Sequence, residues 1–197
     1  MALVAGSRDA PVWCRVQDDL DYKREADIFA KQQRHTKPPS PYEIFNAHIE
    51  ADNQTQVILK SLLESCGLKI THKPAYGCIC AVSTLQSLFI KYGYEILDRA
   101  LRLIVTAWEG DSQSLSSNML KAVTRMVATF GDELNDEKFI QQTGSYTPRE
   151  VTRTAKERRQ GSLGYAMVLL EYYNKRSKGG LSAYKLLGKE EAHNESV

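Results

Sequence analysis

Residues 83–108 read STLQSLFIKYGYEILDRALRLIVTAW, and this stretch decides the fold class. Its apolar residues recur at intervals of three and four, which is the spacing of an amphipathic helix. Gly93 interrupts the pattern, so the sequence predicts one helix over 83–92 and another over 94–108. A helix–glycine–helix segment of this kind fits a DNA-binding helix-turn-helix, and it fits an αα-hairpin equally well.

The same periodicity continues on both sides of this stretch. Ser/Thr–x–x–Glu/Gln boxes predict helix starts, because each pair of side chains caps free backbone amides. The boxes are Ser40–Glu43, Ser83–Gln86 and Thr147–Glu150. The other predicted helices cover residues 19–33, 41 onward, 54–65 (with Val57, Ile58, Ser61 and Leu62 as its apolar stripe), 116–130, 135–143, 147–160 and 162–176.

Few segments fall outside this helical pattern. Val12–Val16 predicts a short strand, and residues 69–80, which contain Pro74 and Gly77, predict a short strand or an extended arm. Residues 178–197 are polar and contain two adjacent glycines, which predicts a flexible tail. The expected fold is therefore mainly α: a helical bundle with at most one or two short N-terminal strands.

Composition sets limits on the class of protein. The chain has 197 residues, of which 42% are hydrophobic and 25% charged, and its net charge is +2, so we expect one domain or two small ones. No run of 18 apolar residues and no signal-peptide pattern occur. We therefore expect a cytoplasmic protein that does not associate with membranes.

Motifs that carry catalysis are missing from the sequence. There is no Gly-rich phosphate loop, no His–x–x–x–His pair and no Gly–x–Ser–x–Gly elbow. Asp18, Asp19 and Asp21 stand at a predicted helix start, where acidic residues cap free amides. The four cysteines are interpreted as reduced thiols; Cys78 and Cys80 are too close for the usual zinc spacing. A mixed site with His72 is the alternative. We expect no enzymatic activity, no catalytic residue, no cofactor and no metal.

A more specific pattern lies between Pro11 and Asp52. A short apolar strand leads into an amphipathic helix, which ends in the turn Gln32-Gln33-Arg34-His35, and Ser40-Pro41-Tyr42-Glu43 then opens a second helix. This order resembles the back half of the ParB-like nuclease domain. In that family an Asn/Gln–x–Arg turn ends one helix and a Ser/Thr-Pro-x-Glu box opens the next.

The resemblance has consequences for the domains. The Gly–x–His–Arg turn that binds phosphate in that family should precede Val12, where this sequence does not contain it. The resemblance implies three parts: a remnant of a ParB-like domain at 1–53, a helical bundle at 54–177 and the tail at 178–197. The helical bundle would correspond to the extension of some phage and mobile-element ParB-like proteins. The family prefers Asn where Gln32 or Gln33 stands, which argues further against nucleotide hydrolysis.

Two other expectations follow from the same N-terminal pattern. If Met1 is an internal start, the missing half lies upstream and the chain is a fragment of an enzyme. A Val12–Val16 strand without sheet partners would also have an unpaired edge, which predicts a homodimer formed by strand pairing.

Basic residues are concentrated between positions 145 and 178, where eight lysines and arginines stand against three glutamates. Arg149, Arg153 and Lys156 follow i, i+4, i+7 spacing and share one helix face, which fits nucleic-acid phosphates or an ordinary solvated face. The leading prediction is a non-enzymatic nucleic-acid-associated protein. The predicted contacts are Arg149, Arg153, Lys156, Arg158 and Arg159, with Lys31, Arg34 and Lys37 as secondary contacts.

A protein-interaction role is the alternative function. A phage-encoded module of this kind would bind and inhibit a host protein, such as a defence protein, through exposed aromatic residues. Tyr165, Tyr172, Tyr173 and Tyr184 are the candidate anchors, although the spacing of the first three also fits the core of a bundle.

Overall fold

Helices dominate the part of the chain that the computed structural model describes, which is residues 38–175 and 180–191. The helices are α2 (Pro41–Glu50), α3 (Gln54–Ser65), α4 (Val82–Trp108), α5 (Ser117–Phe130), α6 (Asp136–Thr143), α7 (Pro148–Arg158), α8 (Ser162–Asn174) and α9 (Ala183–Glu191), with a 3-10 turn η1 (Gly131–Glu133). The predicted mainly α bundle is confirmed. The strand expected at 12–16 and the helix expected at 19–33 lie outside the described residues.

The strands in the described part of the chain are short and form a single pair. β1 (Lys69–Ile70) runs parallel to β2 (Cys78–Ile79), with Lys69 opposite Cys78 and Ile70 opposite Ile79. Gly67 precedes β1 with φ 71°, the left-handed conformation expected of a glycine that ends a helix. The interpretation of 69–80 as containing a short strand is therefore confirmed.

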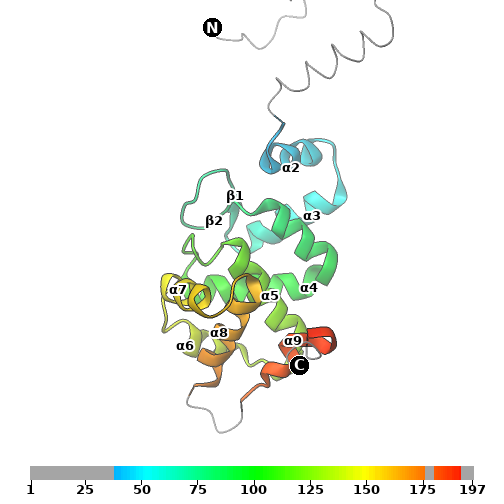
Figure 1. Ribbon diagram of the computed structural model, residues 1–197. Coiled ribbons are helices and arrows are strands. Elements are labelled where there is room, and N and C mark those ends of the chain that lie inside the picture. Colours follow the sequence, from blue (N-terminus) through cyan, green and yellow to red (C-terminus); the bar gives the residue numbers. More distant parts are fainter. Residues whose placement is uncertain (1–37, 176–179, 192–197) are drawn as a thin grey trace, which may run out of the picture. The chain divides into compact units, whose positions relative to one another are not determined.

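The described helices belong to a unit that begins at Pro39. Within it, α2, α3 and the strands lie at one end, α6, α8 and α9 lie at the other, and α4 and α5 lie between them (Figure 1). Because α2 packs against α3 and α4, the chain divides after Pro38 rather than after residue 53, where the sequence placed the boundary.

α8 is the central helix of the C-terminal half. It packs against α5, α6, α7 and α9, and nearly all of its residues from Leu163 to Tyr173 are buried. A helix that is apolar on all sides requires neighbours on all sides. Both Tyr172 and Tyr173 therefore lie in the core, which is one of the two interpretations that their spacing allowed.

α4 consists of two helical stretches that meet at Gly93. This residue has φ 80° and ψ −179°, which is accessible to glycine and strongly disfavoured for other residues. The predicted division at Gly93 is confirmed. The capping box predicted at Ser83 is wrong, because the helix begins at Val82 and Ala81 precedes it without a side-chain cap. The Ser83 carbonyl instead accepts a hydrogen bond from the Ser87 hydroxyl at 2.8 Å.

Two other expectations differ from the structure. In α3 the core takes Leu59, Leu62 and Leu63, whereas Val57 and Ile58 are 42% and 44% exposed. Both sets have helical spacing, so only the neighbouring helices select between them. The expected flexible tail contains α9, in which Leu186 and Leu187 are buried against the bundle. This adjacent apolar pair is too short a pattern to predict a helix.

No helix among the described residues combines the length and the apolar character needed to cross a bilayer.

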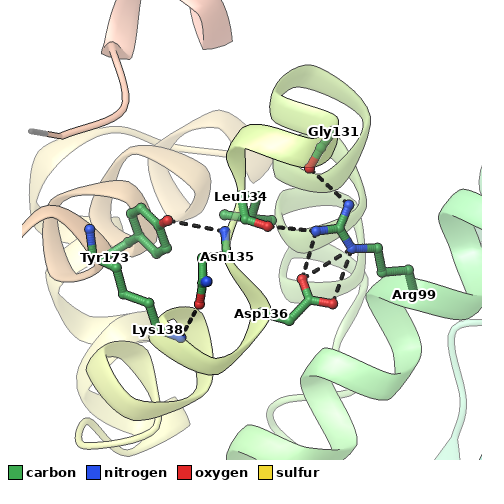
Figure 2. Close-up of polar contacts among 7 residues, drawn as sticks. All are labelled: Arg99, Gly131, Leu134, Asn135, Asp136, Lys138 and Tyr173. Atoms are coloured by element: carbon green, nitrogen blue, oxygen red, sulfur yellow. Dashed lines mark hydrogen bonds and ion pairs between the residues drawn. The ribbon is translucent and has the colours of Figure 1, made fainter.

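Arg99 connects α4 to the segment between α5 and α6 (Figure 2). Its guanidinium donates to both oxygens of Asp136, at distances from 2.7 to 3.2 Å. It also donates to the carbonyl oxygens of Gly131 at 2.8 Å and Leu134 at 2.6 Å. The planar fork of donors on arginine makes such a multiple contact possible, and a lysine could not reproduce it.

The same segment is held from its other side by α8. The backbone N–H of Asn135 donates to the Tyr173 hydroxyl at 3.1 Å, and the Lys138 ammonium lies 4.2 Å from the centre of the Tyr173 ring. The Asn135 side chain caps α6 by accepting from the Lys138 N–H at 2.8 Å. The connection therefore joins α4 to α8 through polar contacts (Figure 2).

We expect Arg99→Ala to lower the free energy of unfolding by about 1.5–3 kcal/mol, the range for hydrogen bonds to a charged group. The side chain is 29% exposed, so solvent screens the interaction only in part. Chemical denaturation measures this loss. Arg102→Ala is the matched control, since Arg102 makes an exposed i, i+4 pair with Asp98 and should contribute far less. Equal losses in the two variants would contradict the role assigned to Arg99.

Candidate nucleic-acid interface

α7 is fixed at its start by a capping box. The Thr147 backbone N–H and hydroxyl each donate to the Glu150 carboxylate at 2.8 Å, and the Glu150 N–H donates back to the hydroxyl at 3.3 Å. Pro148 occupies the first turn, where its missing N–H costs nothing. The predicted box is confirmed, and it sets the rotation of the helix about its axis.

One face of α7 is buried and the opposite face is basic. Pro148, Val151 and Ala155 are buried, and the helix packs against α8. Arg149, Arg153 and Lys156 are exposed, as expected for their i, i+4, i+7 spacing. The structure thus brings these three predicted residues together on one surface, which we call the α7 basic face.

The Glu150 carboxylate on the same helix is already engaged. Hydrogen bonds from the backbone and hydroxyl of Thr147 lower the pKa of Glu150, and the charge of Arg153 lowers it further. Glu150 therefore stays ionised and capped at neutral pH. Its negative charge offsets part of the basic face, and its oxygens are directed at the start of the helix.

Arg158 and Arg159 leave the α7 basic face at the end of the helix. Arg158 is hydrogen-bonded to Glu171 of α8, and this contact together with the charge of Glu171 raises the pKa of Arg158. Arg159 follows the last turn with an extended backbone, φ −155° and ψ 134°. The sequence grouped these two arginines with the other three, but the structure places them beside a groove.

The groove has a volume of about 600 Å³ and lies where the end of α7 meets α8 and α9. It is lined by Arg158, Arg159, Met167, Leu170, Glu171, Asn174, Lys175 and Ala183. We call it the α7–α9 groove. Sequence reasoning missed it because its lining residues come from three helices, and no local pattern relates Met167 or Ala183 to the arginines.

Glycines shape the turn that forms one wall of this groove. Gly161 has φ 84° and ψ −179° immediately before α8. A Cβ atom on Gly164 would lie 2.1 Å from the Arg159 carbonyl oxygen, so the two backbones approach too closely for any other residue. The end of α7 is thereby held against the start of α8.

Lys31, Arg34 and Lys37 lie outside the described residues. Asp18, Asp19 and Asp21, the acidic group interpreted as a helix cap, also lie outside them.

A helix-turn-helix, which the sequence left open beside an αα-hairpin, is not favoured by the arrangement of α4. Only Gly93 separates its two stretches. In the second stretch, Arg99 is hydrogen-bonded to Asp136 and Arg102 to Asp98. Both arginines of this stretch are thus bound within the molecule. The α7 basic face is therefore the better candidate for a nucleic-acid contact.

The interaction anchors expected from the sequence are mostly in the core. Tyr165, Tyr172 and Tyr173 are 4%, 9% and 3% exposed, whereas Tyr184 is 77% exposed. Within the described residues, Cys66, Cys78 and Cys80 are free thiols, and no three His, Cys, Asp or Glu side chains gather into a metal-binding group.

The comparisons with known proteins identify a family. A family model described as a family of unknown function, DUF6551, matches residues 1–184, which is most of the chain. No curated protein matches the chain, and no solved structure does.

We expect the capping box to make a pH-dependent contribution to stability. Because the folded-state pKa of Glu150 is lowered, its contribution is present above the ordinary carboxyl pKa and is lost as pH falls through the lowered value. Melting temperatures recorded between about pH 7 and about pH 3 should fall less in Glu150→Gln than in the parent chain.

Glu157→Gln provides the control for this measurement, because it makes the same charge change on α7 outside the capping box. It should keep the pH dependence of the parent chain. If Glu150→Gln keeps it too, the ionised cap does not stabilise α7.

Proposed function

We propose that this chain, which belongs to the DUF6551 family of unknown function, binds nucleic acid through the α7 basic face. The role is one of binding and not of catalysis. The observation that carries the proposal is the position of Arg149, Arg153 and Lys156 on one exposed face, opposite the buried side of α7. Lysines and arginines placed in this way contact phosphates without reading base sequence.

The dimensions of the face support a backbone contact. At a rise of about 1.5 Å per residue, the step from Arg149 to Lys156 covers about 10 Å. Nucleotides of one strand follow each other at about 3.4 Å along a duplex axis, so the face spans about three of them. Three phosphate contacts predict a slope of about −2.7 for the logarithm of the binding constant against the logarithm of salt concentration.

We expect the double variant Arg153→Glu/Lys156→Glu to weaken binding to all DNA sequences and to reduce the salt slope by about two, since each lost phosphate contact removes about one. Fluorescence anisotropy with a labelled duplex and a labelled single strand, each at low and high salt, measures both quantities.

Lys73→Glu/Lys121→Glu is the control for this double variant. Both lysines are exposed and lie outside α7, so the change of net charge is identical. Binding that falls equally in the two double variants would reflect net charge alone and would contradict a specific role for α7.

A protein-interaction module is the second candidate function. The observation that favours it is the exposure of Ile90 at 77% and Tyr94 at 47%, on either side of the Gly93 kink. Large apolar and aromatic side chains in such positions serve as anchors when a partner covers them. The partner proposed from the sequence is a host protein bound by a phage or mobile-element product.

We expect Ile90→Asp/Tyr94→Asp to abolish the capture of any host protein that the parent chain retains, without loss of helical circular dichroism. Arg153→Glu/Lys156→Glu should keep that protein bound. Retention by the Ile90/Tyr94 variant, compared by affinity capture from host lysate, would exclude this surface as the binding site.

A further inference from the structure

The α7–α9 groove lies at the C-terminal end of α7, where Arg158 and Arg159 line it. We infer that the nucleic acid bound by this chain is single-stranded, and that an unpaired base enters the groove while its phosphates follow the α7 basic face. This inference rests on the proposed function and specifies its ligand.

The lining of the groove is amphipathic. Met167, Leu170 and Ala183 provide an apolar surface, and Arg158, Arg159 and Lys175 line the groove beside the carboxylate of Glu171. Arg158 is bound to Glu171, and the Lys175 ammonium donates to the Tyr146 hydroxyl at 2.5 Å. The volume of about 600 Å³ falls within the range of small-molecule sites, about 300–1,000 Å³. An apolar surface with a cationic border matches a ligand that joins a flat apolar ring to a phosphate.

Fixed contacts hold the walls in place before any ligand arrives. Glu171 holds the Arg158 guanidinium, and the Asn174 side-chain amide both donates to and accepts from the backbone of Leu181 at 2.8 Å. The close backbone approach of Arg159 and Gly164 fixes the remaining side. A preorganised groove loses less conformational entropy on binding than a mobile one.

An unpaired base fits these features better than a duplex does. In a duplex the bases are stacked and paired, so only phosphates and sugars reach a convex helix face, and the apolar lining would gain nothing. In a single strand the base faces are exposed, and they pack on apolar side chains and arginine planes without sequence preference. Arg158 and Arg159, which line the groove, carry guanidinium planes of this kind.

The position of the α7 basic face beside the groove favours a nucleic acid over an acidic peptide. Arg149 to Lys156 span about 10 Å along α7 at about 1.5 Å per residue, which is about three nucleotides at about 3.4 Å each. Arg158 and Arg159 leave this face, and they line the groove within three residues of Lys156. A strand of regularly spaced phosphates therefore passes from the face to the groove around the end of the helix, whereas a peptide carries no comparable fixed repeat of charge.

The test uses fluorescence anisotropy of the full chain with three labelled probes that carry the same number of phosphates. They are an oligothymidine strand, an abasic strand built of tetrahydrofuran units, and a duplex. We expect the oligothymidine to bind about 5- to 150-fold more tightly than the abasic strand, the gain from one base packed on the protein.

Two variants locate the preference in the groove. Ala183→Phe fills it and Met167→Gln makes its lining polar, so each should reduce oligothymidine binding toward that of the abasic strand while abasic binding stays unchanged. Ser182→Phe, at the exposed neighbouring position, should keep the preference. Circular dichroism verifies that each variant is folded. The comparison of the three probes on the parent chain tests the inference even if a variant does not fold.

The results with the three probes distinguish failure of the single-strand inference from failure of the proposed nucleic-acid binding. Equal affinity for the oligothymidine and abasic strands, or tighter binding of the duplex, overturns the inference. The proposed function still stands if Arg153→Glu/Lys156→Glu then weakens every probe. Absence of binding to all three probes at low salt overturns both.

Discussion

The arginine at position 99 is the polar contact on which the arrangement of the bundle depends. A connection between two helices has backbone carbonyls that no helical amide can satisfy, and each one left bare in the interior is costly. Arg99 satisfies two of them and binds Asp136 as well. The same connection reaches Tyr173 through Asn135, so it joins α4 to the central helix α8.

The surface of α7 follows from that arrangement. α8 offers it an apolar wall, and the capping box at Thr147 and Glu150 sets where the first turn begins. With Val151 and Ala155 turned toward the core, Arg149, Arg153 and Lys156 lie on the exposed side of the helix. The basic face is therefore a consequence of burying the other side of α7. Because its charged groups stay in water, folding does not have to remove their hydration.

Much of the fold could be predicted from sequence, because many of its features depend on residues close together. The division at Gly93, the capping boxes at Ser40 and Thr147, and the cations shared by one side of α7 are local properties of this kind. The box at Ser83 failed because Val82 and Leu85 are both buried, and the helix cap lies two residues earlier, at Ala81. Leu59 and Leu63 are buried in place of Val57 and Ile58 because the neighbouring helices select the buried side of α3. The groove depends on contacts between helices in the same way. Binding of nucleic acid by the α7 basic face depends on a second molecule, so contacts within this chain do not determine it.

Gly93 and Gly161 share one backbone conformation, with φ of 80° and 84° and ψ of −179° in both. These angles are the mirror image of the extended conformation that ordinary residues adopt with φ near −80°. At these two points the backbone thus has the handedness of a D-amino acid, and a helix starts directly afterwards. Glycine is the only encoded residue without a chiral centre, so the directions of α8 and of the second stretch of α4 depend on achirality at two positions. No Cβ atom placed at either glycine would meet a neighbour within 4 Å. The restriction there is one of stereochemistry alone, and packing plays no part in it.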